Sequence, residues 1–123
     1  MQEQRRRLVG VVDDDQAVRE SLCLLLETAG YHAIPFESAD QLLAAAEFDA
    51  LDCVVLDHHM PRGTGLELLR HLYQAGRRVP IALMTGSPSP QLTQQALALG
   101  AVTVLEKPLA EAALFGFLGQ SAP

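Results

Sequence analysis

Five short apolar runs alternate along the chain with five segments whose apolar residues recur at helical spacing. Strands that alternate with helices through short connections form a parallel sheet covered on both faces. We therefore predict an α/β fold, a five-stranded parallel sheet doubly wound as (βα)5. The predicted strands are residues 8–12, 31–36, 53–56, 80–84 and 101–105, and the predicted helices are about 16–29, 38–48, 64–75, 90–99 and 109–118.

The run from Cys53 to Leu56 is apolar at every position and leads directly into Asp57. A continuous apolar run of this length is typical of a strand buried on both faces. Asp57 then lies where the strand leaves the core, at the edge where open α/β sheets place their functional sites.

Residues that begin and end helices support the same boundaries. They are Asp15 and Gly30 around the first helix, the capping boxes Ser38–Gln41 and Thr64–Glu67, and Gly76, Pro90 and Gly100.

A chain of 123 residues is enough for one domain, and we assign residues 1–123 to a single domain. Its core covers about 8–118, and 119–123 is a tail or the start of a linker. The formal charge of -6 argues against direct binding to nucleic acid or to an anionic membrane. No signal peptide or membrane-spanning segment is apparent, and Cys23 and Cys53 lack the spacing of metal ligands. We therefore expect a cytoplasmic protein whose two cysteines are reduced core residues.

Polar residues follow four of the five predicted strands. Right-handed crossovers bring the carboxyl ends of parallel strands to one edge of the sheet. We therefore expect these residues to lie together although they are far apart in the sequence. They are Asp13 and Asp14, Asp57, Thr85 and Lys107.

Three carboxylates at one edge repel each other, since two unit charges about 4 Å apart cost roughly 4 kcal/mol at an effective dielectric near 20. They need a proton or a cation. Oxygen ligands open to water favour Mg²⁺, and the absence of a thiolate disfavours Zn²⁺. His58 and His59 are adjacent on an extended segment, so we expect their side chains to point to opposite sides and to belong to a loop rather than to a metal site.

Lys107 is the only lysine in the chain, whereas every other basic residue except histidine is arginine. A compact ammonium is not interchangeable with a guanidinium, so a lysine at this edge points to a specific task. A cation, Mg²⁺, an anionic nucleophile and the Thr85 hydroxyl are together what an incoming phosphoryl group requires.

Four motifs at these strand ends resemble the receiver domain of bacterial two-component response regulators. The resemblance covers residues 8 to about 118, with family-like spacing throughout, and is nearest to receivers attached to helix-turn-helix transcription factors of the nitrogen-fixation regulator type. It implies a flavodoxin-like receiver fold and a signalling domain that is not an enzyme but assists its own phosphorylation and dephosphorylation. The motifs are Val11-Val12-Asp13-Asp14-Asp15, Val54-Val55-Leu56-Asp57-x-x-Met60-Pro61-x-x-x-Gly65, Leu83-Met84-Thr85-Gly86 and Leu105-Glu106-Lys107-Pro108.

The resemblance implies that Asp57 accepts a phosphoryl group from the phosphohistidine of a sensor histidine kinase. It also implies that Asp14, Asp57 and the backbone carbonyl of His59 ligate Mg²⁺ directly, whereas Asp13 acts through water.

In this family a threonine and a lysine hold the phosphoryl oxygens, which are the roles implied for Thr85 and Lys107. The side chains of His59 and Ser87 occupy positions that tune dephosphorylation. The Lys107–Pro108 bond is often cis in such proteins.

The sequence departs from the family pattern at the switch aromatic, a position that Val104 occupies here. A ring cannot move inward at a valine, so we expect signalling to rely on the loop around residues 87–90. Ala98 and Leu109 replace a common basic residue and a frequent phenylalanine.

From residue 87 to the C-terminus only Glu106, Lys107 and Glu111 carry charge. This stretch forms the surface of helix 4, strand 5 and helix 5, which is the usual dimerisation and output surface of the family. So few charges favour association, either as a homodimer or with a C-terminal DNA-binding output domain.

Two alternatives remain open from the sequence. One is an Mg²⁺-dependent phosphatase of the haloacid dehalogenase type, for which Asp13-x-Asp15 fits half of the nucleophile motif but Ala17 does not fit the rest. The other is a receiver-like interaction module that is not phosphorylated, and the complete set of acidic residues, Thr85 and Lys107 argues against it.

Overall fold

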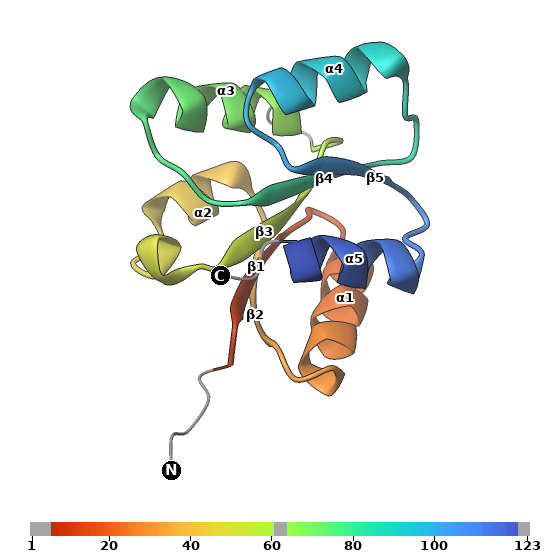
Figure 1. The fold of residues 1–123 in the computed structure, drawn as a ribbon. Helices are drawn as coiled ribbons and strands as arrows, with labels where there is room; N and C mark the ends of the chain where they lie inside the picture. Colours follow the sequence, from red (N-terminus) through yellow and green to blue (C-terminus); the bar gives the residue numbers. More distant parts are fainter. Residues whose placement is uncertain (1–5, 61–63, 121–123) are drawn as a thin grey trace.

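The computed structural model describes residues 6–60 and 64–120 and has the predicted alternation of strands and helices (Figure 1). The elements are β1 (Leu8–Val12), α1 (Gln16–Thr28), β2 (His32–Phe36), α2 (Ala39–Ala44), a 3₁₀ turn η1 (Phe48–Ala50), β3 (Cys53–Asp57), α3 (Gly65–Ala75), β4 (Ile81–Thr85), α4 (Pro90–Ala98), β5 (Thr103–Glu106) and α5 (Glu111–Gln120). Residues 61–63 and 121–123, which include Pro61 of the second motif and most of the predicted tail, lie outside the described residues.

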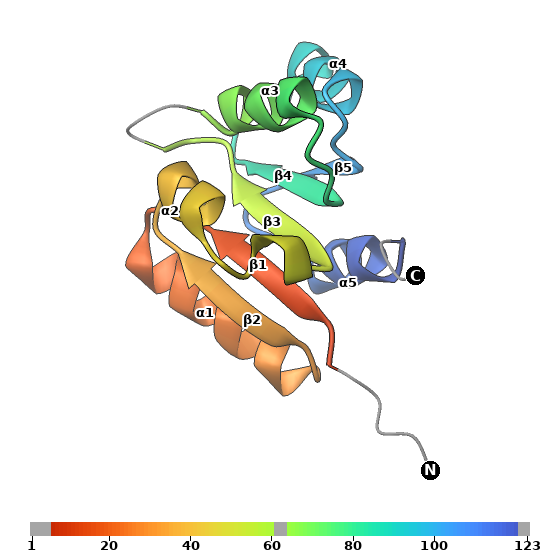
Figure 2. The same ribbon diagram turned by 90° about the vertical axis from the view of Figure 1, so that its left-hand side faces the viewer.

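All neighbouring strands pair in parallel, in the order β2-β1-β3-β4-β5. Helices α1 and α5 cover one face of the sheet, and α2, α3 and α4 cover the other (Figures 1 and 2). The predicted doubly wound fold is therefore confirmed. None of the described helices has the length and apolar character needed to cross a membrane.

The central strand β3 shows why its sequence is apolar at every position. All five of its side chains are buried. Val54 and Leu56 pack with the α2–α3–α4 layer, whereas Cys53 and Val55 pack with α1 and α5. Because both faces of the strand are covered, alternation with polar residues would bury unpaired polar groups.

The predicted helix ends are largely confirmed. Asp15 and Ser38 accept backbone N–H groups at the starts of α1 and α2, and Thr64 and Glu67 form a reciprocal capping box before α3. The predicted Ser38–Gln41 box is only half formed, because the Gln41 side chain accepts the Glu37 amide instead. Gly30, Gly76 and Gly100 have positive φ, which satisfies the carbonyls at the helix ends without a Cβ penalty.

Three elements have boundaries that differ from the prediction by two residues or more. The second helix ends at Ala44 rather than near Phe48, because the chain becomes extended at Ala45 and the η1 turn carries Phe48 into the core. The last strand begins at Thr103 rather than Ala101, because the Ala101 amide still donates to Ala96 O at the end of α4. The last helix begins at Glu111 rather than Leu109 and continues through residue 120. The Lys107–Pro108 bond that precedes it is cis.

Candidate functional site

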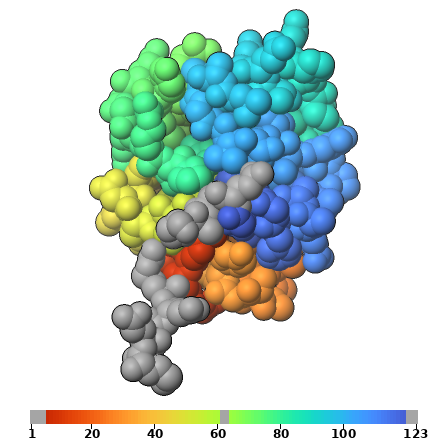
Figure 3. Space-filling view, viewed as in Figure 1, coloured from red at the N-terminus to blue at the C-terminus, as the bar shows by residue number. Residues whose placement is uncertain are grey.

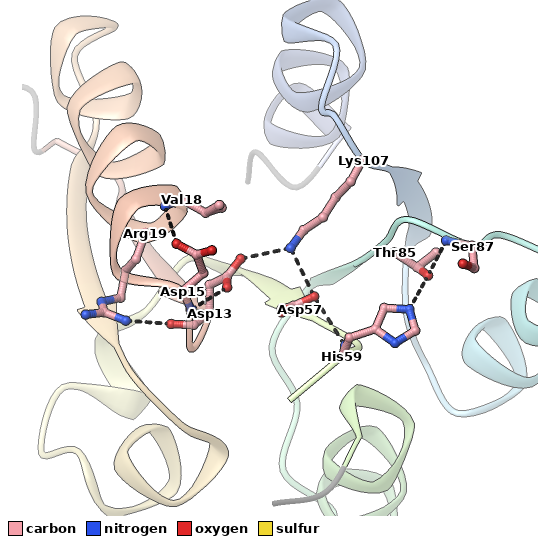
Figure 4. A network of polar contacts seen from close by, with 9 residues as sticks. All are labelled: Asp13, Asp15, Val18, Arg19, Asp57, His59, Thr85, Ser87 and Lys107. Carbon is pink, nitrogen blue, oxygen red and sulfur yellow. Dashed lines mark hydrogen bonds and ion pairs between the residues drawn. The ribbon is translucent and has the colours of Figure 1, made fainter. Parts of the chain in front are cut away.

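The residues predicted at the strand ends lie together at the carboxyl edge of the sheet (Figure 4). Asp13 follows β1, Asp57 and Thr85 are the last residues of β3 and β4, and Lys107 follows β5. Asp13, Asp57 and Thr85 are the buried polar side chains of the described residues, with 1%, 3% and 0% of their surface exposed. The fold thus buries charge at the edge where the sequence predicted a site.

Three carboxylates form a cluster in which one oxygen each of Asp13, Asp14 and Asp57 lies within 4.8 Å of the others. Asp14 is exposed, whereas the other two are buried. Such a set offers only oxygen donors and one side open to water, which fits Mg²⁺. The chemistry of the donors therefore agrees with the predicted ion.

Lys107 supplies the positive charge of this cluster. Its Nζ atom lies 3.1 Å from Asp13 Oδ2 and 3.2 Å from Asp57 Oδ1. Burial acts to lower the pKa of Lys107, but the hydrogen bond that its ammonium donates to Asp13 and the charge of Asp57 outweigh burial and raise this pKa overall. The ammonium is therefore held protonated between two buried carboxylates.

One ammonium does not balance the acidic groups. Burial raises the pKa of Asp57, and the charge of Asp13 raises it further despite the nearby Lys107. The ionised form of Asp57 is thus disfavoured in the protein without a bound cation. Binding of a cation at this site would therefore be favourable, because it would stabilise the ionised carboxylates.

Arg19 contributes to the site although the sequence reasoning did not identify it. It donates to the backbone carbonyl of Asp13 at 2.7 Å, and Asp13 Oδ1 accepts the Asp15 amide at 3.0 Å. Together these contacts fix the turn that carries the carboxylates. An arginine one turn into the helix after the acidic run was the available signal.

The hydroxyl of Thr85 is held by residues of two loops. His59 Nε2 lies 3.0 Å from Thr85 Oγ1, and the Ser87 amide donates to the same oxygen at 3.0 Å (Figure 4). The amide of His59 in turn donates to Asp57 Oδ1 at 3.2 Å. The two residues expected to tune dephosphorylation therefore both contact Thr85.

The expectation that His58 and His59 point to opposite sides is wrong. Their ring centroids lie 4.9 Å apart in an edge-to-face arrangement, because the chain bends at His58 and does not continue as an extended strand. His58 Nδ1 is buried and has no hydrogen-bond partner among the described residues. Burial, and then the neighbouring His59, lower the pKa of His58.

Gly65 lets helix α3 approach this bend closely. A Cβ atom there would collide with the side chain of Leu83 and would lie 3.0 Å from the Cα atom of His58. Val104, at the switch-aromatic position, is partly buried against the α2–α3–α4 layer and so takes no part in the polar cluster.

An apolar groove of about 600 Å³ adjoins the cluster. It lies between α1 and the connection from β5 to α5, and Lys107 forms part of its wall. The residues that line it are Ala17, Val18, Ser21, Leu22, Leu25, Met84, Lys107, Pro108 and Leu109.

Comparisons with known proteins identify relatives over nearly the whole chain. The transcriptional regulatory protein FixJ of Azorhizobium caulinodans is 42% identical over 118 residues, which are 93% of this chain and 56% of that protein. The response regulator protein TodT of Pseudomonas putida is 33% identical over 112 residues, 91% of this chain and 49% of that protein. The chain thus spans about half the length of the curated relatives it matches.

Solved structures show the same fold. The chemotaxis protein CheY4 of Vibrio cholerae superimposes with a TM-score of 0.86 at 28% identity, covering 96% of this chain and 100% of that one. The crystal structure of FixJ-N superimposes with a TM-score of 0.83 at 28% identity, covering 96% of this chain and 94% of that one. The family profile described as the response regulator receiver domain matches residues 9–118. With these matches and the cluster at its sheet edge, the chain belongs to the family of response regulator receiver domains.

Proposed function

We propose that Asp57 is the phosphoacceptor of this receiver domain and that a sensor histidine kinase is the donor. The observation that carries the proposal is the pairing of a buried aspartate with the single lysine, beside two further carboxylates and a buried threonine hydroxyl. An Asp57 carboxylate oxygen forms the new P–O bond as the P–N bond of the phosphohistidine breaks, and the leaving imidazole takes up a proton. Lys107 and Thr85 then hold the phosphoryl oxygens.

In this proposal Asp14, Asp57 and the His59 carbonyl hold Mg²⁺ directly and Asp13 acts through water. The contacts of Asp13 are consistent with an indirect role, since its two carboxylate oxygens already bind Lys107 and the Asp15 amide. A bound Mg²⁺ would neutralise the excess acidic charge and the charge of the phosphoryl oxygens.

The kinase is proposed to dock over the groove between α1 and the β5–α5 connection. That groove is apolar, adjoins the acceptor cluster and includes Lys107 in its wall. A helix carrying the phosphohistidine can bury apolar side chains there while its imidazole faces Asp57. Such a partner places the domain in the cytoplasm.

The acceptor proposal is tested by incubating the protein with acetyl phosphate. We expect incorporation of up to one phosphoryl group per chain when Mg²⁺ is present and none when EDTA removes it, because the carboxylates need a cation. Mass spectrometry of the intact protein measures the incorporation. A protein that stays unlabelled in both conditions would instead be an interaction module that is not phosphorylated.

A generic phosphate ester supplies the matching control, since a phosphatase turns it over whereas a receiver does not. The structure argues against the phosphatase, because the Asp15 carboxylate accepts the Val18 amide and caps α1 (Figure 4). Sustained release of inorganic phosphate would contradict the receiver proposal.

The surface of α4, β5 and α5 is proposed to form a homodimer or to contact an output domain. These elements form one side of the molecule in Figure 3, where they run from cyan to blue. No residue of α4 is charged, and Leu97 and Val102 are 48% and 40% exposed. The relatives are about twice as long, and one is named a transcriptional regulatory protein. We therefore propose a C-terminal DNA-binding domain as the output domain.

Analytical ultracentrifugation tests the dimer. We expect the protein to self-associate more tightly with beryllofluoride and Mg²⁺ than without them, and we expect Leu97→Glu to weaken association about tenfold or more by placing a charge in an apolar contact. Leu24→Glu is the matched control, because Leu24 is 70% exposed on α1, away from this surface. A protein that is monomeric at high concentration in both conditions would refute self-association.

A further inference from the structure

The Thr85 hydroxyl already forms hydrogen bonds in this structure, in which no phosphoryl group is bound. Among the described residues its oxygen has two hydrogen-bond partners, the Ser87 amide and His59 Nε2, each at 3.0 Å. The threonine side chain is fully buried.

The Thr85 hydroxyl can donate only one hydrogen bond. A threonine hydroxyl has one proton to donate and two lone pairs that accept. The Ser87 N–H group donates to one lone pair. A neutral imidazole whose Nε2 atom carries no proton can then accept the hydroxyl proton of Thr85. Phosphoryl oxygens only accept, so a phosphoryl group on Asp57 needs the same proton.

We propose that His59 is a positioning residue that holds Thr85 in the resting state by accepting its hydroxyl proton, and that it competes with the phosphoryl group for that proton. The inference rests on the proposed function, in which Thr85 binds a phosphoryl oxygen. It assigns His59 a role in the equilibrium between resting and activated states, separate from any effect on the rate of dephosphorylation.

The position of His59 suits this role. Its backbone amide donates to Asp57 Oδ1 at 3.2 Å, so one residue contacts both the acceptor and the threonine. The residue is exposed, so its ring can leave Thr85 without opening the core. In the resting state the ring also packs edge-to-face on His58.

The same contacts connect Thr85 to the loop after β4. The oxygen that faces His59 also accepts the Ser87 amide. If the Thr85 side chain moves towards the phosphoryl group when it leaves His59, the Ser87 amide loses this acceptor. The loop can then rearrange although Val104 offers no ring to move inward. His59 and Ser87 together thus take the place of an aromatic switch.

The experiment measures the equilibrium affinity for beryllofluoride in the presence of Mg²⁺, which binds the acceptor aspartate as a phosphoryl mimic and is independent of hydrolysis. We expect His59→Ala to bind it roughly fivefold more tightly than wild type, which corresponds to the net loss of one competing hydrogen bond. His59→Gln should stay within about twofold of wild type, because its amide oxygen can accept the same proton. His71→Ala, on the exposed side of α3, is the control and should bind as wild type does.

Three further measurements separate this role from a general structural one. In a Thr85→Ala background the effect of His59→Ala should vanish, since the coupling passes through the hydroxyl. The ¹⁵N resonance of His59 Nε2 should be that of an unprotonated, accepting nitrogen at rest and should change when beryllofluoride binds. Hydrogen exchange of the Ser87 amide should become faster in the same step.

The possible contrary results distinguish a failure of the His59 inference from a failure of the proposed function. Unchanged or weaker beryllofluoride affinity in His59→Ala, a protonated Nε2 at rest, or unchanged exchange at Ser87 would overturn the inference. A wild-type protein that takes up neither beryllofluoride nor phosphoryl groups would instead refute the proposed function, so the two failures are distinguishable.

Discussion

Asp57→Asn is expected to abolish phosphoryl uptake and, at the same time, to stabilise the metal-free protein. The asparagine has nearly the shape of the aspartate but no nucleophilic oxygen, so labelling from acetyl phosphate should fall on the order of a hundredfold or more, to background. Intact mass spectrometry with Mg²⁺ measures the loss. Retention of labelling at another residue would show that Asp57 is not the acceptor.

The stability gain follows from the direction of the Asp57 pKa. Burial and the charge of Asp13 raise that pKa, so the folded protein binds the proton more tightly than the unfolded chain does. Ionised Asp57 therefore costs free energy at neutral pH. The cost disappears as the pH falls through the raised pKa towards the ordinary value of 3.8.

Urea unfolding in EDTA measures this effect as a difference between the variant and wild type, because the difference cancels all other titrating groups. Asp57→Asn should be the more stable protein at pH 7, and the difference should shrink towards pH 3.8. Asp49→Asn, an exposed carboxylate with the same change in charge, should stay within about 0.5 kcal/mol of wild type. A variant less stable than wild type at pH 7 would show that Lys107 outweighs the burial and repulsion of Asp57.

Local patterns in the sequence predicted the fold and most of the residues that form the site. The continuous apolar run into Asp57 predicted a strand covered on both faces, and strand alternation with helices predicted that distant polar residues meet at one edge. Capping residues placed most helix ends within one or two residues. Backbone sterics and burial determine these features, and both leave direct marks in the sequence, as apolar runs and as residues that cap helices.

The contacts inside the site were not predictable in the same way. The contact between His59 and Thr85 follows the bend of the chain at His58, and no residue pattern predicted that bend. The end of α2 at Ala44 was missed because Phe48 reaches the core through a separate turn, a tertiary effect that overrides helix propensity.

Lys107→Met is the second change with a large expected effect. It should lower the stability of the metal-free protein, whereas Asp57→Asn should raise it. Methionine keeps much of the apolar stem but removes the charge, so Asp13 and Asp57 lose the cation that lies 3.1 and 3.2 Å away. Breaking a buried ion pair leaves uncompensated charge and costs 3 to 5 kcal/mol in typical proteins. The Lys107 side chain is 27% exposed, so we expect a loss of about 3 kcal/mol in EDTA, a large part of the stability of a domain this size.

Mg²⁺ shows whether that loss is electrostatic. The carboxylates of the variant are less neutralised than those of wild type, so Mg²⁺ should bind the variant more tightly and restore more of its stability, as unfolding in EDTA and in saturating Mg²⁺ would measure. Lys107→Arg keeps a positive charge beside the carboxylates and should recover most of the stability. It should not recover phosphoryl uptake, because a planar guanidinium does not reproduce the geometry with which a compact ammonium is proposed to hold the phosphoryl oxygens. An equal loss with and without Mg²⁺ would assign Lys107 a packing role, and the excess of acidic charge could then no longer support the proposed binding of Mg²⁺ at this site.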